Sequence, residues 1–406
     1  VLNSLGNTVA KNPYLATLKD ILFFGSPRRK LQEDGKWWDI YCDPIIEDLN
    51  YTYLYLEPPY LNKHFTPSRT SNIRYLDLID FLASVQRKAR LIRISLTERE
   101  KNLVQRIADQ ISAQSGVEID LATLVKQDLL TRKSLLPLYR SLLGKAKPKL
   151  AMIICSYGKE TFIEACKGMK IPVIELQHGV VSKYDVAYSY PGPQRIKRSF
   201  PDYFFAFGDF WKTCTEFPIS KERIYSIGYP YLEKGIEQYG NTVKKDQCLF
   251  ISEGTTGRAL SQFAVELNNS NQSQYKIIYK LHPGEYHRWK REYPWLAESG
   301  ITVVAGEEIP LYQLFAESKV QVGVASMAIY EGLAFGLRTY LLALPGIEHM
   351  EYLIAKKYAT VVTSVDELVA ILQEESAVNI DTEDLFREDS LRNMHGAIDQ
   401  IIALQD

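Results

Sequence analysis

Short β-branched or apolar runs alternate with longer amphipathic stretches from about Pro148 onward. A strand-then-helix repeat of this kind is typical of βαβ units, in which helices cover the faces of a parallel sheet. The alternation therefore constrains the chain to an α/β fold. In the first series we expect strands at residues 150–155, 172–176 and 203–207, with a helix at 159–170.

A polar stretch at residues 235–246 carries two glycines and interrupts this alternation. A second series follows, with strands expected at 248–252, 276–281, 301–304, 320–324 and 338–342, and helices from 259, over 311–318 and from 326. Each series predicts a doubly wound sheet of its own. We therefore predict an N-terminal domain over residues 1–240, a C-terminal domain over 241–406, and a linker between them at 235–246.

The two ends of the chain are less regular. The first 147 residues predict a strand at 19–24 and helices at 97–114 and 121–143, without a clean repeat. Residues 390–404 predict a last helix, which is able to cross back to the N-terminal domain. Its apolar side chains have helical spacing and should be buried, and they are Leu391, Met394, Ile398 and Ile401.

Length and composition exclude several classes of protein. The chain has 406 residues, 46% of them hydrophobic and 24% charged, which is globular and too long for one ordinary core. The apolar runs are far shorter than the roughly 20 residues of a membrane-spanning helix. The five cysteines are widely spaced and mostly inside apolar runs, so we expect buried thiols and a reducing, cytoplasmic location.

The net charge of −1 hides an asymmetry. Residues 1–240 contain 34 Lys/Arg and 26 Asp/Glu, a balance of +8, and residues 241–406 contain 14 and 23, a balance of −9. A positive N-terminal half attracts an anionic polymer, a lipid phosphate or an anionic membrane face. Nucleic acid is not expected as a partner, because no aromatic-interleaved basic motif or zinc spacing is present.

Polar residues follow several of the predicted strands, where doubly wound sheets bind their ligands. Four such places stand out, and they are the Gln177-His178-Gly179 turn, the His282-Pro283 pair, Ser326 with Glu331 in the helix that Ser326 opens, and the run Gly254-Thr255-Thr256-Gly257-Arg258. Each feature alone also fits a structural role, such as an N-cap for Ser326 or a simple turn for the glycine loop. The last three occur in one domain, in the order glycine loop, His282-Pro283 and the helix from Ser326 to Glu331, and this combination favours a site for a phosphorylated ligand.

Each of these features has a use with a nucleotide. Ser326 offers a hydroxyl beside the free amides of a helix N-terminus, which suits a phosphate. The carboxylate of Glu331 can accept hydrogen bonds from ribose hydroxyls. His282 can give a charged hydrogen bond to the phosphate as it leaves. The glycine turn can bring its backbone amides, and the following Arg258, close to a phosphate or a sugar ring.

In the order of its motifs the chain resembles the bacterial glycosyltransferases of the GT-B fold that build capsule, lipopolysaccharide and teichoic acid polymers. The motifs are similar to those of capsule polysaccharide transferases, bacterial sialyl- and polysialyltransferases and CDP-glycerol glycerophosphotransferases. The resemblance covers about residues 150–345. It is carried by Gln177-His178-Gly179, Ile227-Gly228-Tyr229-Pro230, Lys280-Leu281-His282-Pro283, and Ser326 to Glu331 with Gly332 and Gly336.

The resemblance implies two Rossmann-like domains facing across a cleft, with the donor nucleotide on the C-terminal domain. It implies that His282 and Ser326 contact the nucleotide phosphate, that Glu331 contacts the ribose, and that the His178 loop faces them. The sialyltransferases have Ser-Ser or Ser-Thr where this chain has Ala325-Ser326, which weakens the case for a CMP donor. Their acidic-acidic-Gly motif is matched only in letters, by Glu33-Asp34-Gly35.

The leading functional prediction is a metal-independent glycosyltransferase that uses a nucleotide sugar as co-substrate and needs no other cofactor. No Asp-x-Asp and no His/Cys pair with ligand spacing is present. An inverting enzyme needs a general base for the acceptor hydroxyl. His178 suits that role by residue type, and Glu160 and Asp185 are the alternatives. A retaining mechanism does not need this base.

Two other functions stay open. One is a nucleotide-sugar 2-epimerase, for which Glu253 and Arg258 are the candidate residues, and the other is a catalytically inactive binding module. For a transferase, the positive half predicts an anionic glycan or lipid-linked acceptor bound near Arg195, Lys197 and Arg198. The same charge predicts peripheral association with the cytoplasmic face of the inner membrane.

Overall fold

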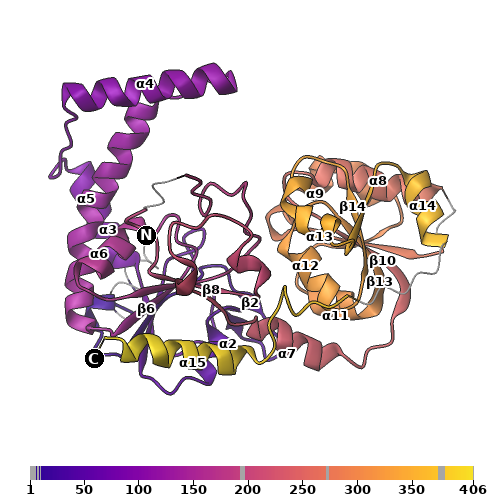
Figure 1. Cartoon of the computed structure of the whole chain (residues 1–406), viewed down its shortest axis with the longest axis horizontal. Coiled ribbons are helices and arrows are strands. Elements are labelled where there is room, and N and C mark those ends of the chain that lie inside the picture. Colours follow the sequence, from indigo (N-terminus) through magenta and orange to yellow (C-terminus); the bar gives the residue numbers. More distant parts are fainter. Residues whose placement is uncertain are drawn as a thin grey trace. The chain divides into compact units, whose positions relative to one another are not determined.

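The computed structural model describes residues 6, 9, 11–192, 197–270, 274–373 and 380–405. Two parallel sheets form its framework, one of seven strands and one of six, and both are visible in Figure 1. The predicted fold class, α/β with two doubly wound Rossmann-like domains, is confirmed. A short antiparallel pair, β2 (Lys30–Leu31) and β3 (Trp37–Trp38), stands apart from both sheets.

The first sheet has the strand order β5-β4-β1-β6-β7-β8-β9. Its strands are β1 (Ile21–Phe24), β4 (Tyr53–Glu57), β5 (Ile73–Tyr75), β6 (Leu150–Ile154), β7 (Val173–Leu176), β8 (Tyr203–Ala206) and β9 (Ile224–Ser226). β1 pairs in parallel with β4 on one side and β6 on the other. The chain therefore reverses its direction of travel through the sheet between these strands, and that reversal marks the ligand-binding position of such sheets.

The second sheet has the order β12-β11-β10-β13-β14-β15, which is the 3-2-1-4-5-6 order of a Rossmann domain. Its strands are β10 (Lys245–Ile251), β11 (Lys276–Lys280), β12 (Thr302–Val304), β13 (Ser318–Gly323), β14 (Arg338–Leu342) and β15 (Ala359–Val362). All five of its neighbouring pairs are parallel. The reversal lies between β10 and β13.

Helices cover the sheets. They are α2 (Asp43–Glu47), α3 (Asp77–Lys88), α4 (Glu98–Ser115), α5 (Leu121–Ala146), α6 (Glu160–Gly168), α7 (Pro230–Tyr239), α8 (Gly257–Asn269), α9 (Trp289–Glu292), α10 (Pro294–Glu298), α11 (Leu311–Glu317), α12 (Met327–Ala334), α13 (Glu351–Ala355), α14 (Val365–Gln373) and α15 (Ser390–Ala403). Single turns of 3₁₀ helix are η1 (Pro13–Leu15), η2 (Phe210–Lys212), η3 (Lys221–Arg223), η4 (Pro283–Glu285) and η5 (Ile347–Met350).

The core of each domain is apolar and continuous, because the central strands are buried on both faces. β1, β6 and β7 are buried along their whole length, as parallel strands between helix layers must be. On the first sheet α3, α5 and α6 supply one covering layer. On the second sheet α8 and α14 pack on one face and α11 and α12 on the other (Figure 1).

The chain divides into two compact units. Unit 1 comprises 1–176, 197–204 and 404–406, and unit 2 comprises 177–196 and 205–403. The segment expected as a linker is largely regular, because α7 continues to Tyr239 and β10 begins at Lys245. Gly235 lies inside α7, where an added Cβ would come within 2.1 Å of the ring of Tyr312. This glycine therefore serves close packing rather than flexibility.

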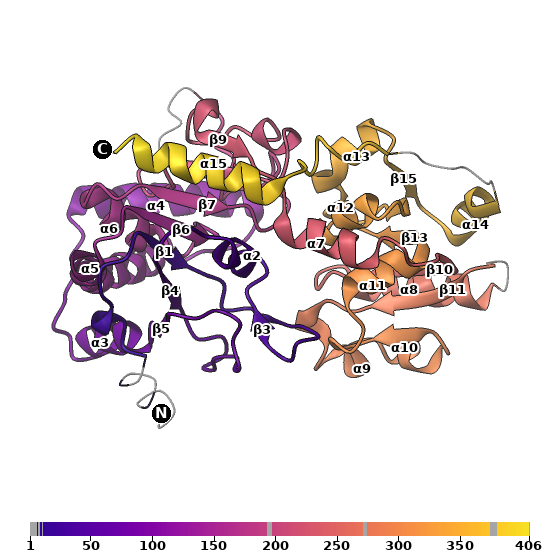
Figure 2. The ribbon, with the colours of Figure 1, turned by 90° about the horizontal axis from the view of Figure 1, so that it is seen from below.

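The last helix forms as predicted, and three of the five cysteines, Cys42, Cys166 and Cys248, are buried as expected, whereas Cys155 and Cys214 are only partly buried. Of the apolar stripe of α15, Met394, Ile398 and Ile401 are buried and Leu391 is partly buried. α15 contacts α7, as the neighbouring helices in Figure 2 show. The Ser390 backbone N–H donates to Glu233 over 3.0 Å. All five cysteines are free thiols. None of the helices in the described part of the chain combines the length and apolar character needed to cross a bilayer.

Candidate functional site

The strand reversal of the second sheet brings together two of the predicted motifs. Glu253 and Gly254 follow β10, and Ala325 and Ser326 follow β13, its neighbour in the sheet. The backbone N–H of Ala325 lies close enough to the Glu253 carboxyl to lower its pKa. The carboxyl ends of the two strands therefore meet where a doubly wound domain binds its ligand.

The glycine turn also meets the His282-Pro283 turn. A Cβ on Gly254 would lie 3.5 Å from Arg288 Nη2 and 4.0 Å from His282 Nδ1. Arg288 joins the two turns, because Nη2 donates to the Gly254 carbonyl over 3.2 Å and Nε to the Gly284 carbonyl over 3.1 Å. The two motifs that the strand-end rule identified are thus parts of one surface.

A buried carboxylate holds the histidine in place. Glu285 is fully buried and accepts from the His282 backbone N–H over 2.8 Å and from the Tyr293 hydroxyl over 2.8 Å. The ring atom His282 Nδ1 accepts from the Gly284 N–H over 3.1 Å. In the neutral imidazole the proton therefore resides on Nε2, which makes that atom the donor toward an oxygen of a ligand.

A cavity of about 500 Å³ opens beside the glycine turn. Thr255, Thr256 and Arg258 line one wall, and residues 344–346 after β14 line the other. The Arg258 guanidinium lies 5.3 Å from the centre of the Trp295 ring, which limits its freedom. Three of the residues predicted to bind the donor therefore share a cavity that is large enough for part of a sugar nucleotide.

His349 acts electrostatically on two carboxyls of unit 2. His349 Nδ1 lies 2.8 Å from the Ser182 hydroxyl, so the 177–192 segment and the segment after β14 are joined there. The charge of His349 also lowers the pKa of Asp185, from the first segment, and of Glu253, from the glycine turn. We call Asp185, His349 and Glu253 the acid–histidine cluster. It includes Asp185, one of the three predicted base candidates.

Both carboxyls of the cluster hold their protons more tightly than usual. Burial raises the pKa of Asp185, against the opposing effects of the Ala187 N–H and of His349. Burial likewise raises the pKa of Glu253, against the Thr255 hydroxyl, His349 and the Ala325 N–H. Carboxyls with pKa values moved toward neutrality are suited to exchange protons with a substrate.

The turn that carries His178 is held by its neighbour. Gln177 is 1% exposed, its Oε1 accepts from the Phe207 N–H over 2.9 Å, and its Nε2 donates to the Gly179 carbonyl over 3.0 Å. His178 lies between these two anchored positions and is partly buried. Its role as general base stays a prediction.

The helix that Ser326 opens has structural contacts of its own. The Ser326 hydroxyl accepts from the Ala328 N–H over 3.3 Å, which is N-cap geometry. Glu331 is 9% exposed and accepts a 2.6 Å hydrogen bond from the Tyr312 hydroxyl. The ring of Tyr312 packs against other aromatic rings, including that of Tyr231. The phosphate role of Ser326 and the ribose role of Glu331 stay predictions.

The remaining predicted residues belong to unit 1. Glu160 begins α6 and lies 3.8 Å from Lys197 Nζ. Glu160 and Arg198 line one cavity of about 800 Å³, together with residues of α5 such as Arg132. Arg195, the third predicted acceptor residue, lies outside the described residues. Glu160, Lys197 and Arg198 thus belong to unit 1, whereas His178 and Asp185 belong to unit 2.

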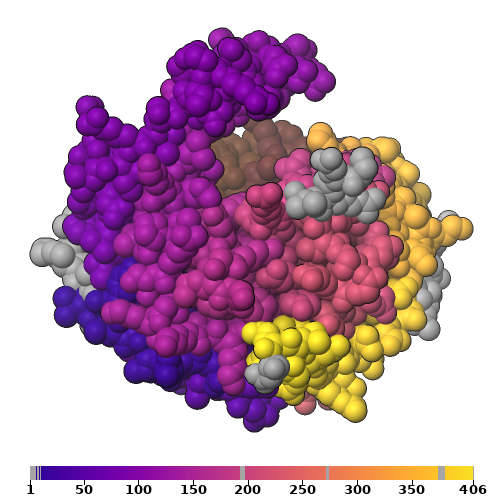
Figure 3. All heavy atoms as spheres, turned by 60° about the vertical axis from the view of Figure 1, so that its left-hand side comes forward, coloured from indigo at the N-terminus to yellow at the C-terminus, as the bar shows by residue number. Residues whose placement is uncertain are grey.

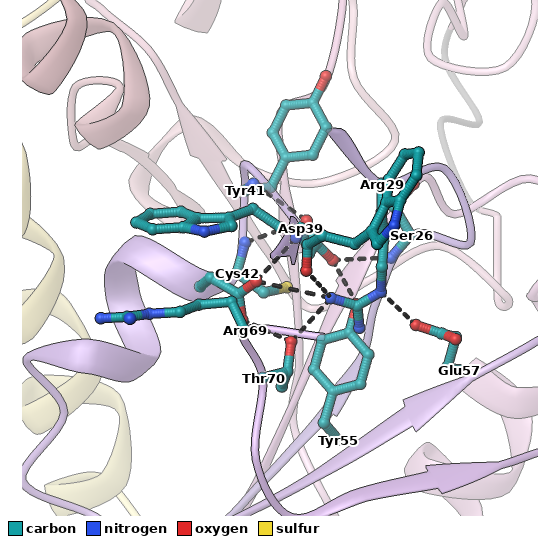
Figure 4. A network of polar contacts seen from close by, with 12 residues as sticks. Ser26, Arg29, Asp39, Tyr41, Cys42, Tyr55, Glu57, Arg69 and Thr70 are labelled. Carbon is teal, nitrogen blue, oxygen red and sulfur yellow. Dashed lines mark hydrogen bonds and ion pairs between the residues drawn. The ribbon is translucent and has the colours of Figure 1, made fainter. Parts of the chain in front are cut away.

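Unit 1 also contains a buried polar network that sequence reasoning missed (Figure 4). Asp39 accepts from the Ser26 N–H over 2.9 Å and from the Tyr55 hydroxyl over 2.5 Å. The buried guanidinium of Arg29 pairs with Glu57, at the end of β4, and donates to Thr70 over 2.9 Å. These contacts tie the segment after β1 to the carboxyl ends of its neighbours.

The Glu33-Asp34-Gly35 run, which matches the acidic-acidic-Gly motif of the sialyltransferases in letters only, lies in the turn of the β2–β3 hairpin. There Asp34 accepts a hydrogen bond from Trp38 Nε1 over 3.3 Å.

Comparisons with solved structures extend the fold assignment. UDP-GlcNAc 2-epimerase from Methanocaldococcus jannaschii is 11% identical, with 94% of this chain and 99% of that chain covered and a TM-score of 0.54. The enzyme of the same name from Neisseria meningitidis, bound to UDP-GlcNAc, is 11% identical with 95% and 100% covered and a TM-score of 0.55. The chain has the GT-B fold.

A third similar structure is the wall teichoic acid polymerase TagF. It is 13% identical, with 100% of this chain and 97% of that chain covered and a TM-score of 0.50. No protein-family model and no curated protein matches the chain. At these identities the likeness shows the fold, and the functional argument has to come from the residues of the site.

His349 is the residue of the acid–histidine cluster that sequence reasoning missed. It follows β14, one of the predicted strands, so the strand-end rule covers it. His349 was not selected because it does not directly follow the strand: it lies seven positions after the strand's last residue, Leu342. The left-handed backbone at Gly346, with φ of 103°, turns the chain so that the histidine reaches Ser182.

Proposed function

We propose that this protein transfers a glycosyl group from a nucleotide-activated donor to a glycan or lipid-linked acceptor in the synthesis of a bacterial surface polysaccharide. The observation that carries the proposal is the acid–histidine cluster beside the glycine turn. The cluster contains two carboxyls with raised pKa values, and one of them, Glu253, directly precedes the glycine turn where we expect the phosphorylated donor to bind. The GT-B fold and the resemblance of the motifs to capsule-type transferases support the same class.

In this proposal the donor phosphates lie against the glycine turn and His282. The His282 ring donates from Nε2 to a phosphate oxygen, and the backbone amides at the start of α8 face the same group. As the anomeric carbon separates from the phosphate oxygen, negative charge grows on the leaving nucleotide. These fixed donors stabilise that charge, and no resident metal ion is invoked.

Asp185 serves as the base in the proposed mechanism. The acceptor oxygen forms its bond to the anomeric carbon while the bond to the donor phosphate breaks, and the acceptor proton passes to the Asp185 carboxylate. His349 acts electrostatically on Asp185, and the Ser182 hydroxyl, 2.8 Å from Nδ1, orients the ring of His349. Glu253 lies on the donor side of His349 and accepts hydrogen bonds from a sugar hydroxyl.

A nucleotide-sugar 2-epimerase is the second candidate function. The observation that favours it is the same cluster, because epimerisation needs acid and base groups around one sugar carbon and both Asp185 and Glu253 have raised pKa values. The set predicted from sequence, Glu253 with Arg258, is thereby extended by Asp185 and His349. The two candidates differ in whether turnover requires an acceptor.

The test begins with a thermal-shift panel of CMP, UDP, GDP, ADP and their sugars. A ligand at about 100 times its dissociation constant stabilises the folded state by roughly 2.7 kcal/mol. The stabilising sugar nucleotide is then incubated with and without glycan acceptors. Transfer requires an acceptor and yields a new glycosidic bond, whereas an epimerase converts the donor alone. A protein that binds nucleotide but turns over no sugar is the inactive binding module.

Variants of the acid–histidine cluster test the assigned roles. Asp185→Asn is expected to lower kcat about a hundredfold or more, since a general base contributes at least that much. His349→Asn and Glu253→Gln are expected to lower kcat/KM at least tenfold. The matched control is Glu266→Gln, an exposed glutamate on α8, which should behave as wild type. An Asp185→Asn variant with full transferase activity would remove Asp185 from the mechanism.

A further inference from the structure

One stretch of unit 1 combines positive charge with exposed apolar side chains. Residues 81–97 contain four Lys/Arg and no Asp/Glu. They form the second half of α3 and the segment that leads to α4. We use the name basic–apolar strip for the six exposed residues of this stretch that concern us, which are Phe81, Val85, Lys88, Arg90, Leu91 and Arg93.

The apolar members of the strip are exposed to an unusual degree. Phe81 is 56% exposed, Val85 40% and Leu91 71%. Phe81, Val85 and Lys88 are spaced by four and three residues on α3, so they occupy one helix face. The strip therefore presents a large aromatic and two aliphatic side chains among cations.

The strip is held in this conformation by specific contacts. Two residues after the end of α3 at Lys88, Arg90 adopts the left-handed conformation, with φ of 53°. The Leu91 N–H then donates to the Gln86 carbonyl over 3.0 Å. Lys133 Nζ of α5 donates to the Arg93 carbonyl over 3.2 Å. At helix ends of this type the residue after the left-handed position commonly packs back on the helix. Here that residue is Leu91, and it stays exposed.

We propose that the basic–apolar strip docks unit 1 on the surface of an anionic phospholipid bilayer. Lys88, Arg90 and Arg93 would lie at the level of the lipid phosphates, and Phe81, Val85 and Leu91 would enter the boundary between head groups and acyl chains. Stable membrane attachment generally needs two signals, and the strip supplies both an apolar and a cationic one. The proposal does not depend on the reaction that the protein catalyses.

A second copy of the chain is the rival occupant. In a twofold symmetric dimer the strip would meet itself, so the same cations would face one another without a counter-charge. A better dimer surface is the row Leu103, Ile107 and Ile111 on α4, where Glu98, Glu100 and Asp109 accompany the basic residues. Figure 3 shows α4 as the purple arm at the top of the view. The positive charge of the basic–apolar strip therefore favours an anionic bilayer over a second copy of the chain as its partner.

The experiment is vesicle co-sedimentation of the full chain at low ionic strength. One vesicle preparation contains phosphatidylglycerol with phosphatidylcholine, and the other contains phosphatidylcholine alone. Wild type is expected to bind the first much more tightly. Neutralising Lys88, Arg90 and Arg93 together to Gln should weaken that binding roughly a hundredfold, at about a fivefold loss for each charge near the surface. Leu91→Ser should weaken it about tenfold.

The control variants test whether binding depends on the strip itself or on any exposed positive charge or apolar side chain of the protein. Lys356→Gln with Lys357→Gln removes two exposed charges of unit 2, and Val243→Ser removes a side chain that is 82% exposed. Both should bind as wild type. All substituted side chains are exposed, so unchanged thermal unfolding is expected. Equal binding of the triple variant and wild type would overturn the proposal, and so would a concentration-dependent dimer that Leu91→Ser dissociates.

Discussion

At the scale of single residues, a buried group of charged side chains in unit 1 surrounds His64. His64 lies between two carboxylates, with Nδ1 2.6 Å from Glu57 and Nε2 2.8 Å from Asp77. Its ring stacks on Tyr75 at 3.5 Å between centroids. Burial lowers the pKa of His64, but the hydrogen bonds to Asp77 and Glu57 outweigh it and raise the pKa to about 9.

This shift predicts how the stability of unit 1 depends on pH. A histidine whose folded pKa is raised stabilises the fold fully below its unfolded pKa of about 6.5, and that stabilisation is lost as pH rises through the folded value. Between the pKa of Asp43, which burial raises to about 7, and that of His64 at about 9, the His64 contribution dominates the change. Wild type should lose roughly 2 kcal/mol of unfolding free energy over that interval.

Urea unfolding at the two ends of this pH interval measures the loss. His64→Gln should remove most of the pH dependence, because no ring then titrates between Glu57 and Asp77. The matched control is His287→Gln, since His287 is exposed on the surface of unit 2. A His64→Gln variant that loses stability with pH as steeply as wild type would show that another group is responsible.

At the scale of elements, helix α8 depends on the absence of a side chain at its first residue. A Cβ on Gly257 would lie 2.2 Å from Glu285 Oε1 and 2.7 Å from the Tyr293 hydroxyl. Glu285 is the buried carboxylate that holds the His282 backbone N–H. The start of α8 and the His282 turn are therefore packed against each other without room for a methyl group.

Gly257→Ala should destabilise unit 2 by roughly 2 kcal/mol, the usual cost of overpacking a filled site. It should also reduce the stabilisation by nucleotide, because Glu285 is displaced from the His282 turn. The control is Gly144→Ala in α5, where the nearest atom, Met169 Cε, is 4.0 Å from the added Cβ. That change should stabilise by about 0.5–1 kcal/mol, as alanine does in a helix. Thermal unfolding of the two variants would show opposite shifts, and equal shifts would contradict the packing argument.

The same scale shows what the sequence could predict. The strands of the second sheet were predicted to within a few residues up to β14, because each is an apolar run that ends at a Gly, His or Ser turn. β15 was missed, since its exposed Thr360 interrupts a run of only four residues. β4 and β5 were missed because only the hairpin, the short helix α2 and irregular segments separate them from β1, so the strand–helix alternation is absent there.

The residues of the candidate site likewise divide into those that the sequence could predict and those that it could not. The glycine turn and His282 were predicted to lie together, and they do, because both directly follow neighbouring strands. His349 and the Arg29 network were not predicted, since each depends on contacts between residues more than 10 positions apart. Asp39 and Tyr55, for example, are 16 residues apart and belong to different strand ends. Tertiary contacts of this kind leave no periodic signal in one sequence.

At the scale of the whole molecule, charge is distributed unevenly along the chain. Residues 1–240 carry a balance of +8 and residues 241–406 a balance of −9. The positive side chains include Lys197 and Arg198, and Arg198 lines the cavity of about 800 Å³ in unit 1. If the proposed transferase binds an anionic acceptor there, the attraction acts through partly solvated charges. Such attraction is screened over about 8 Å at physiological ionic strength.

Salt should therefore weaken the binding of the acceptor more than the binding of the donor. In the transfer assay the acceptor KM is expected to rise severalfold from low to physiological ionic strength. Donor affinity in the thermal-shift assay should change less, because its proposed phosphate contacts are the backbone amides of the glycine turn and the partly buried His282 ring. Lys197→Gln combined with Arg198→Gln should raise the acceptor KM at low salt and flatten its salt dependence. Lys356→Gln with Lys357→Gln, a change of equal charge in unit 2, should leave both constants as in wild type. An acceptor KM that ignores both salt and the Lys197 and Arg198 substitutions would place acceptor binding on other residues.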